Sequence, residues 1–204
     1  MADISSIVLA GGRSLRLGRD KMRENLESQS LLERVLGHLE GLGGEIVVVM
    51  SEESSFPLPG RPALRKVSDI YPGRGALGGL YTGLCTSATL YNIVVAGDMP
   101  FLNLELLRYL AGVSAGFDAV IPRLSGMMEP LHAVYSRNCL PAIEALLPRG
   151  EVPICDFYPL VSVRYVEEAE MAPFDPQHLS FFNINTAADL ERARRLLQKQ
   201  GNPF

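Results

Sequence analysis

The 204 residues are 47% hydrophobic, 21% charged and 7% aromatic, which is typical of one folded globular domain and excludes a disordered, collagenous or coiled-coil chain. No apolar run reaches the roughly 20 residues of a membrane-spanning helix, and the first residues lack the basic flank and apolar core of a secretory signal, so we expect a cytoplasmic protein. The net charge of −4 argues against a general nucleic-acid or membrane-surface binder.

Two apolar runs rich in β-branched residues predict buried strands at residues 4–9 and 45–50. Between them, Ser30 and Glu33 have the spacing of a capping box, and apolar residues then recur at helical spacing until Gly41. The order strand, loop, helix, strand favours a parallel crossover.

The same alternation continues along the chain, and it predicts an α/β fold: a Rossmann-like three-layer sandwich with a mostly parallel central sheet. No internal repeat or long linker divides the sequence, so we expect a single domain over residues 1–204. The further expected elements are strands at 63–67, 91–96, 118–122, 132–135 and 161–166, and helices at 77–86, 104–110, 141–147 and from Thr186 onward.

The three cysteines, Cys85, Cys139 and Cys155, form no CxxC pair. An odd number of widely separated cysteines supports neither a disulfide framework nor a zinc ribbon. We expect all three to be small core residues.

Positive charge is concentrated near the start of the chain. Residues 13–23 hold five Lys and Arg side chains, where even spreading of the total of 19 would give about one. The segment follows the first strand and the pair Gly11–Gly12, a placement that suits a small polyanion, although a solvated charged loop is the alternative. It is neither a Walker A loop, because Met22 rather than Ser or Thr follows Lys21, nor the dinucleotide fingerprint GxGxxG.

The segment from Leu9 to Lys21, LAGGRSLRLGRDK, resembles the signature of nucleotidyltransferases, and in this form it is similar to the molybdenum cofactor guanylyltransferases. Four more blocks occur in the family's order: DIYPGRGALGG (69–79), GDMPF (97–101), EPLHAVY (129–135) and FNINT (182–186). The resemblance therefore covers nearly the whole chain and implies a fold of the nucleotidyltransferase type.

The resemblance implies a Mg²⁺-dependent enzyme that transfers GMP from GTP to molybdopterin and releases pyrophosphate. It further implies that the N-terminal half binds GTP, that the C-terminal half binds molybdopterin, and that the protein makes transient contact with molybdoenzyme apoproteins or chaperones. Two alternatives remain at this point. One is a related nucleotidyltransferase using CTP or another phosphorylated acceptor, and the other is a non-catalytic nucleotide-binding accessory protein.

For the first block, the resemblance implies that Lys21 contacts phosphate and that the loop holds guanine through Leu9, Ala10, Gly11 and Gly12. Gly11 favours guanine over cytosine because the related cytidylyltransferases have LAAG at this position. Arg16 and Arg13 can neutralise the triphosphate, or can pair at the surface with Asp20 or Glu24.

The resemblance makes Asp98 the Mg²⁺ ligand and a catalytic residue, which agrees with the preference of Mg²⁺ for carboxylate oxygen. The alternative is that Asp98 caps the helix that begins near Asn103. Asp69 is implied in a nucleotide contact, and turn capping is its alternative. Some relatives have an asparagine near the position of Met50 that contacts the nucleotide, and a methionine side chain cannot donate the hydrogen bond of such an asparagine.

Asn183 and Asn185 lie two residues apart in an expected extended segment, so both face one side and Ile184 faces the other. The two amides can hold a pterin edge or a phosphate, or they form a polar junction capped by Thr186. His132 lies in the EPLHAVY block. Histidines within strands are more often structural than catalytic.

Overall fold

The computed structural model describes residues 4–11, 24–52, 54, 56–57, 60 and 62–200. The strands in these residues are β1 (Ile4–Leu9), β2 (Asn25–Leu26), β3 (Gln29–Ser30), β4 (Ile46–Met50), β5 (Leu64–Ser68), β6 (Tyr91–Ala96), β7 (Ala119–Leu124), β8 (Met127–Met128), β9 (His132–Ser136) and β10 (Val163–Glu167). The α-helices are α1 (Leu31–Glu40), α2 (Gly75–Thr86), α3 (Leu104–Gly112), α4 (Leu140–Glu144), α5 (Glu168–Met171) and α6 (Ala187–Gln200). Short 3₁₀ helices lie at Arg137–Cys139, Leu147–Arg149, Ile154–Leu160 and Leu179–Phe181.

The central sheet has the strand order β10-β7-β9-β6-β1-β4-β5, and β8 pairs with the end of β7. Neighbouring strands are parallel from β5 to β6 and between β7 and β10. The strand β9 runs antiparallel between β6 and β7. The mostly parallel α/β sheet expected from the sequence is therefore confirmed.

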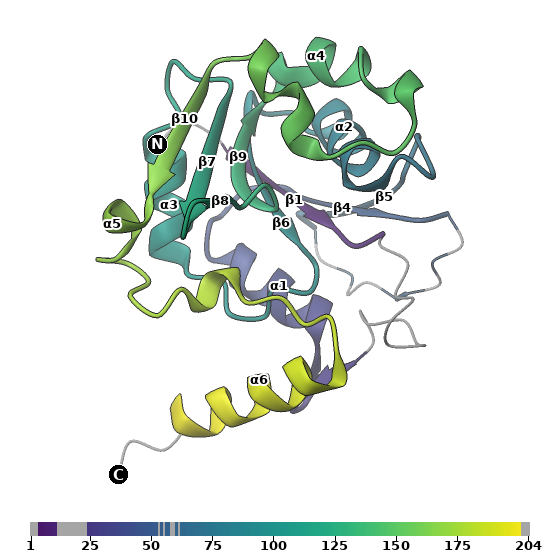
Figure 1. The fold of residues 1–204 in the computed structure, drawn as a ribbon. Helices are drawn as coiled ribbons and strands as arrows, with labels where there is room; N and C mark the ends of the chain where they lie inside the picture. Colours follow the sequence, from purple (N-terminus) through teal and green to yellow (C-terminus); the bar gives the residue numbers. More distant parts are fainter. Residues whose placement is uncertain are drawn as a thin grey trace.

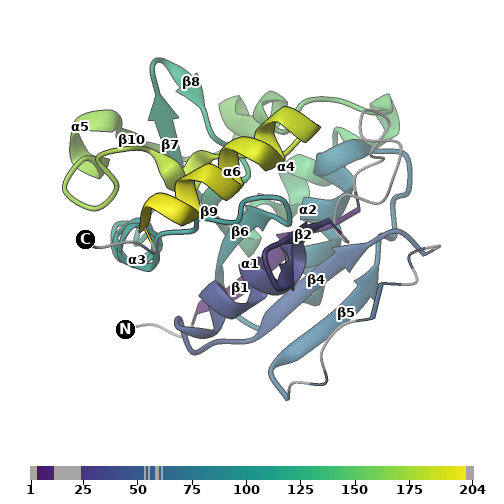
Figure 2. The same ribbon diagram turned by 90° about the horizontal axis from the view of Figure 1, so that it is seen from below.

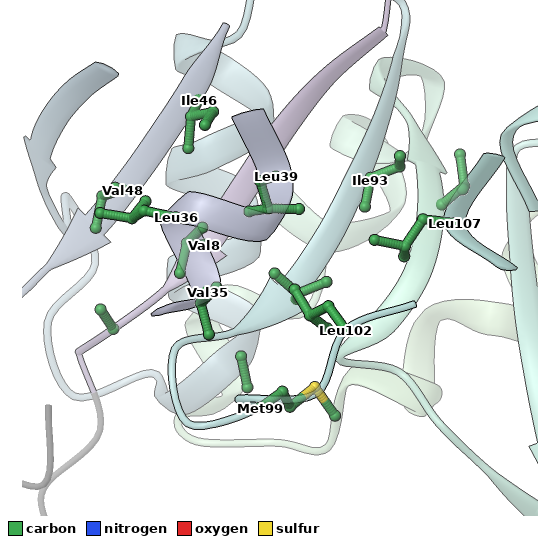
Figure 3. Packing of buried hydrophobic residues seen from close by; sticks show 14 of the residues in the cluster. Val8, Val35, Leu36, Leu39, Ile46, Val48, Ile93, Met99, Leu102 and Leu107 are labelled. Atoms are coloured by element: carbon green, nitrogen blue, oxygen red, sulfur yellow. The ribbon is translucent and has the colours of Figure 1, made fainter. Parts of the chain in front are cut away.

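Helices cover both faces of this sheet (Figure 1). On one face, α1 and α3 pack against side chains such as Val8, Val48 and Ile93, and Figure 3 shows Leu36 and Leu39 of α1 in this layer. On the other face, α2 and α4 enclose a second apolar cluster. Strand β4 is buried along its whole length, as expected for a strand covered on both sides.

The first helix begins as the sequence predicts. The backbone N–H of Glu33 donates to Ser30 Oγ at 3.3 Å, and the Ser30 N–H donates to a Glu33 carboxylate oxygen at 2.8 Å, which completes the capping box. Helix α2 lies close against β1 because Gly83 has no side chain: a Cβ there would come within 2.5 Å of Ile7 Cγ2.

The terminal helix α6 lies outside the layer of α1, as Figures 1 and 2 show. It forms a third apolar cluster in which Leu190, Ala193 and Leu197 pack with Leu26 and Leu31. This is the apolar face expected from the sequence. Among the described residues, no helix is both long and apolar enough to cross a bilayer.

Two expectations need correction, and one element was not expected. The helix expected at 141–147 is interrupted: α4 ends at Glu144, and a 3₁₀ turn that contains Pro148 follows. The 3₁₀ helix Ile154–Leu160 was not expected. Cys139 is a core residue, but Cys85 is exposed and Cys155 is half-buried, so the expectation that all three cysteines lie in the core was wrong.

Candidate functional site

The carboxyl ends of four parallel strands meet at one edge of the sheet. In register, Leu9 of β1 lies beside Val49 of β4 and Ala96 of β6, and Met50 lies beside Ser68 of β5. Chain order reverses at β1, with β4 on one side and β6 on the other. The crevice beyond such a reversal is where open α/β sheets bind their ligands.

The end of β1 and the residue after it are held by main-chain hydrogen bonds from both sides. The N–H of Ala10 donates to Val49 O at 2.9 Å, and Leu9 O accepts the N–H of Gly97 at 3.0 Å. Gly11 is exposed at this edge. Gly12, Arg13, Arg16, Lys21 and the rest of the basic segment lie outside the described residues.

Asp98 follows β6 directly and is only 5% exposed. Its backbone oxygen accepts the N–H of Ile184 at 3.0 Å. It does not cap α3, since Asn103 is the cap and accepts the Leu106 N–H at 3.0 Å. The capping alternative for Asp98 is therefore wrong, and the buried Asp98 lies just beyond the carboxyl end of β6.

Asp69 lies at the same edge, where its N–H donates to Met50 O at 2.8 Å. Its Oδ1 accepts the N–H of Tyr71 at 3.0 Å and the hydroxyl of Thr82 at 2.9 Å. The turn-capping role is therefore present. Gly75, with φ of +59°, lets the loop enter α2 in a conformation that L side chains rarely adopt.

Met50 contributes to this edge through its backbone. Its side chain is 1% exposed and belongs to the apolar core. The structure thus gives the Met50 side chain a packing role.

Asn183 and Asn185 alternate with a buried residue, as expected. Ile184 is fully buried, Asn183 is half-buried and Asn185 is exposed. The junction into α6 is also polar and capped: the Asp189 N–H donates to Thr186 Oγ1 at 3.1 Å. The hydroxyl of Thr186 in turn donates to the Asp189 carboxylate, and this bond is the leading cause of a lowered Asp189 pKa.

His132 is fully buried, and its Nε2 lies 2.6 Å from Ser180 Oγ. Burial lowers the pKa of His132 to about 4, so the ring is neutral near pH 7. It contacts Ser180 and the ring of Phe181, whose centroid is 4.5 Å away. Ser180 carried no signal in the sequence, because its partner is 48 positions away.

Across the described parts of the chain, no three His, Cys, Asp or Glu side chains gather into a metal centre. The carboxyl edge of the sheet therefore brings together the buried Asp98, the main chain of residues 9–11 and, bonded to Asp98 through Ile184, the segment of Asn183. This is an edge suited to a phosphorylated ligand.

Residues 6–158 match the family model described as the MobA-like NTP transferase domain. The chain belongs to this family. Among curated relatives, the probable molybdenum cofactor guanylyltransferase of Pelotomaculum thermopropionicum is 38% identical over 95% of this chain and 93% of its own length. The molybdenum cofactor guanylyltransferase of Desulfosudis oleivorans is 32% identical over 97% and 98%.

Solved structures agree with the membership in the MobA-like NTP transferase family. Molybdopterin-guanine dinucleotide biosynthesis protein A from Archaeoglobus fulgidus superposes with a TM-score of 0.84 at 31% identity, covering 96% of this chain and 99% of that one. The 2-C-methyl-D-erythritol 4-phosphate cytidylyltransferase from Thermus thermophilus has a TM-score of 0.70 at 17% identity, over 96% and 99%. This second likeness concerns the fold alone.

Proposed function

We propose that the protein transfers GMP from GTP to molybdopterin and releases pyrophosphate. The observation that carries the proposal is that relatives named molybdenum cofactor guanylyltransferase align over more than nine-tenths of the chain. The fold supports it, because Asp98 and the Leu9–Gly11 backbone lie at the carboxyl ends of the adjacent strands β6 and β1, where nucleotides bind in such sheets.

In this reaction, an oxygen of the terminal phosphate of molybdopterin attacks the α-phosphorus of GTP. A phosphorus–oxygen bond forms there, and the bond from the α-phosphorus to the oxygen bridging to the β-phosphate breaks. The electron pair of that bond leaves with pyrophosphate. Because two anions must meet, the protein's task is mainly charge neutralisation and positioning.

The nucleotide side of the proposed site consists of residues near the carboxyl ends of β1 and β5. The main chain of Leu9, Ala10, Gly11 and Gly12 would hold guanine, and Lys21 and Arg16 would neutralise the phosphates. Asp69 would contact ribose or base with the part of its carboxylate not used in the turn. Its Oδ1 is already bonded to Tyr71 and Thr82.

We propose Mg²⁺ as the cofactor, held by Asp98. The donor fits, since a hard carboxylate buried at the crevice suits an ion that takes one or two protein carboxylates and completes its coordination with phosphate and water. When bound, the ion would neutralise charge on the phosphates of GTP. Opposite Asp98, Asn183 and Asn185 would hold the pterin edge or phosphate of the acceptor. The product would then pass to a molybdoenzyme apoprotein or its chaperone by transient contact.

The test is an assay of pyrophosphate release with purified protein, Mg²⁺, molybdopterin and either GTP or CTP. We expect release with GTP and little with CTP. Turnover with CTP but not GTP would overturn the guanine assignment, and turnover only with a sugar or polyol phosphate would change the acceptor. Nucleotide binding without any release would identify an accessory protein instead.

A further inference from the structure

Two segments far apart in the sequence, residues 98–103 and 180–184, run side by side in opposite directions. Ile184 is bonded through its N–H to Asp98 O, and the Phe182 and Phe101 rings are in contact at 5.8 Å between centroids. Further along, the N–H of Asn103 donates to Ser180 Oγ at 2.9 Å. Residues 98, 101 and 103 thus face residues 184, 182 and 180, and this register determines where Asn183 lies relative to Asp98.

Ser180 is the point where this pair of segments is attached to the sheet. Its side chain is fully buried, and its hydroxyl bonds both the Asn103 N–H and the ring of His132 on β9. Its own N–H donates to Asp175 Oδ2 at 2.8 Å. His132 is beside Val95 in the register of β9 with β6, three residues before Asp98. The bond between His132 and Ser180 therefore joins the strand that leads to Asp98 with the segment that leads to Asn183.

Core packing alone does not account for a histidine at this position. Within the described residues, His132 Nδ1 has no hydrogen-bond partner although it is buried. A buried polar atom without a partner costs stability, whereas an apolar side chain of similar size would carry no such cost. The feature that an apolar residue could not supply is the bond to Ser180.

We propose that His132 is a positioning residue for the transfer reaction: through Ser180 it sets the register between the loop of Asp98 and the acceptor-side segment of Asn183 and Asn185. The inference rests on the proposed function. On the nucleotide side, the main chain at Leu9 and Ala10 is bonded to β4 and β6 rather than to Ser180. Breaking the bond should therefore weaken use of the acceptor and leave GTP binding nearly unchanged.

The kinetic test compares Ser180→Ala and His132→Leu with a matched control, Ser5→Ala. Ser5 is also a fully buried serine and bonds Thr89 at 3.0 Å, but it lies at the opposite edge of the sheet. We expect both test variants to raise KM for molybdopterin about tenfold, with KM for GTP within about twofold of wild type. In His132→Gln, an amide can replace the ring nitrogen, and we expect it to restore most of the loss. Ser5→Ala should change neither KM.

A second measurement needs neither substrate nor Mg²⁺. Hydrogen exchange at the Ile184 amide, which is bonded to Asp98 O, should be faster in Ser180→Ala and His132→Leu than in wild type and Ser5→Ala. Exchange at Ile184 that is equal in all four proteins would overturn the inference, as would equal rises of KM for GTP and molybdopterin. If His132→Leu does not fold, Ser180→Ala, which removes a single oxygen, decides the question. Absence of any turnover in wild type would reject the proposed function alone, and the exchange data would still decide the register.

Discussion

From β5 to β6 the sheet is parallel, and the loops at its carboxyl edge are held by main-chain bonds such as Ala10 to Val49 and Asp69 to Met50. From β9 to β10, buried side chains attach the neighbouring segments in addition to main-chain bonds. His132 bonds Ser180, and the hydroxyls of Tyr135 and Tyr158 lie 2.7 Å apart. The proposed nucleotide side thus depends mainly on strand register, while the proposed acceptor side depends on the main-chain bond from Ile184 to Asp98 and on a few polar pairs between residues distant in sequence.

Asp98 is the residue where the two regions meet, and replacing it should have the largest effect. Asp98→Asn keeps the shape of the side chain and removes its charge, so it is a poor ligand for Mg²⁺. We expect pyrophosphate release to fall by at least about 100-fold while the thermal unfolding midpoint stays close to that of wild type.

Asp118→Asn is the matched control for Asp98→Asn. The Asp118 carboxylate accepts the Ser162 N–H at 2.9 Å, at the amino end of β7 and away from the crevice. We expect this variant to lose stability but to keep its turnover. If Asp98→Asn kept more than about a tenth of wild-type activity, the proposed metal role would be wrong.

The parallel region can be destabilised by a substitution away from the carboxyl ends of its strands. A Cβ at Gly44, between α1 and β4, would lie 2.0 Å from the backbone oxygen of Ile4. Main chain cannot move aside as a flexible side chain can, so Gly44→Ala should lower the free energy of unfolding by about 3 kcal/mol. Urea denaturation measures the loss, and KM for GTP of the folded fraction should not change.

Gly112→Ala tests whether that loss comes from the clash. No atom lies within 4 Å of a Cβ placed at Gly112. We expect its effect on the free energy of unfolding to stay within about 0.5 kcal/mol. Equal losses in the two variants would contradict the account.

The parallel region was the more predictable one because each of its elements has a local signature. A run of β-branched apolar residues indicates a buried strand, and the Ser30 and Glu33 pair marks the start of a helix. Parallel pairing then brings strand ends to one edge whatever their distance in sequence. The placement of Asp69 and Asp98 at the same edge as Leu9 follows from that rule.

The other region was less predictable for a physical reason. The 3₁₀ helix Ile154–Leu160 has no repeat of 3.6 residues and contains Pro159, so an apolar periodicity in the sequence does not predict it. The bond between His132 and Ser180 joins residues 48 positions apart, and each alone looks like an ordinary core or turn residue. Such pairs become visible only when the chain is folded.

The pH dependence of stability tests the buried histidine. In the folded protein burial lowers the pKa of His132 to about 4, against 6.5 in the absence of burial. Between these values the unfolded chain binds the proton more strongly than the folded chain. The contribution of neutral His132 to the free energy of unfolding is therefore complete above about pH 7 and is lost as the pH falls toward 4. From pH 7 to pH 5, wild type should lose about 2 kcal/mol more than His132→Gln in urea denaturation. The other two histidines are common to both proteins, so equal losses would show that His132 is not buried as described.

The smallest effect is expected at Gly37, and its sign is opposite to that of the other substitutions. Gly37 is an exposed interior residue of α1, and no atom lies within 4 Å of a Cβ placed there. Alanine restricts the unfolded chain and favours the helix, so Gly37→Ala should raise the free energy of unfolding by about 0.5–1 kcal/mol. Because Gly37 lies on the exposed side of α1, away from the apolar face that packs against the sheet and against Ile184, neither KM should change. A stabilised variant with an altered KM for molybdopterin would mean that the two regions are coupled through α1, and the separation between them would then have to be abandoned.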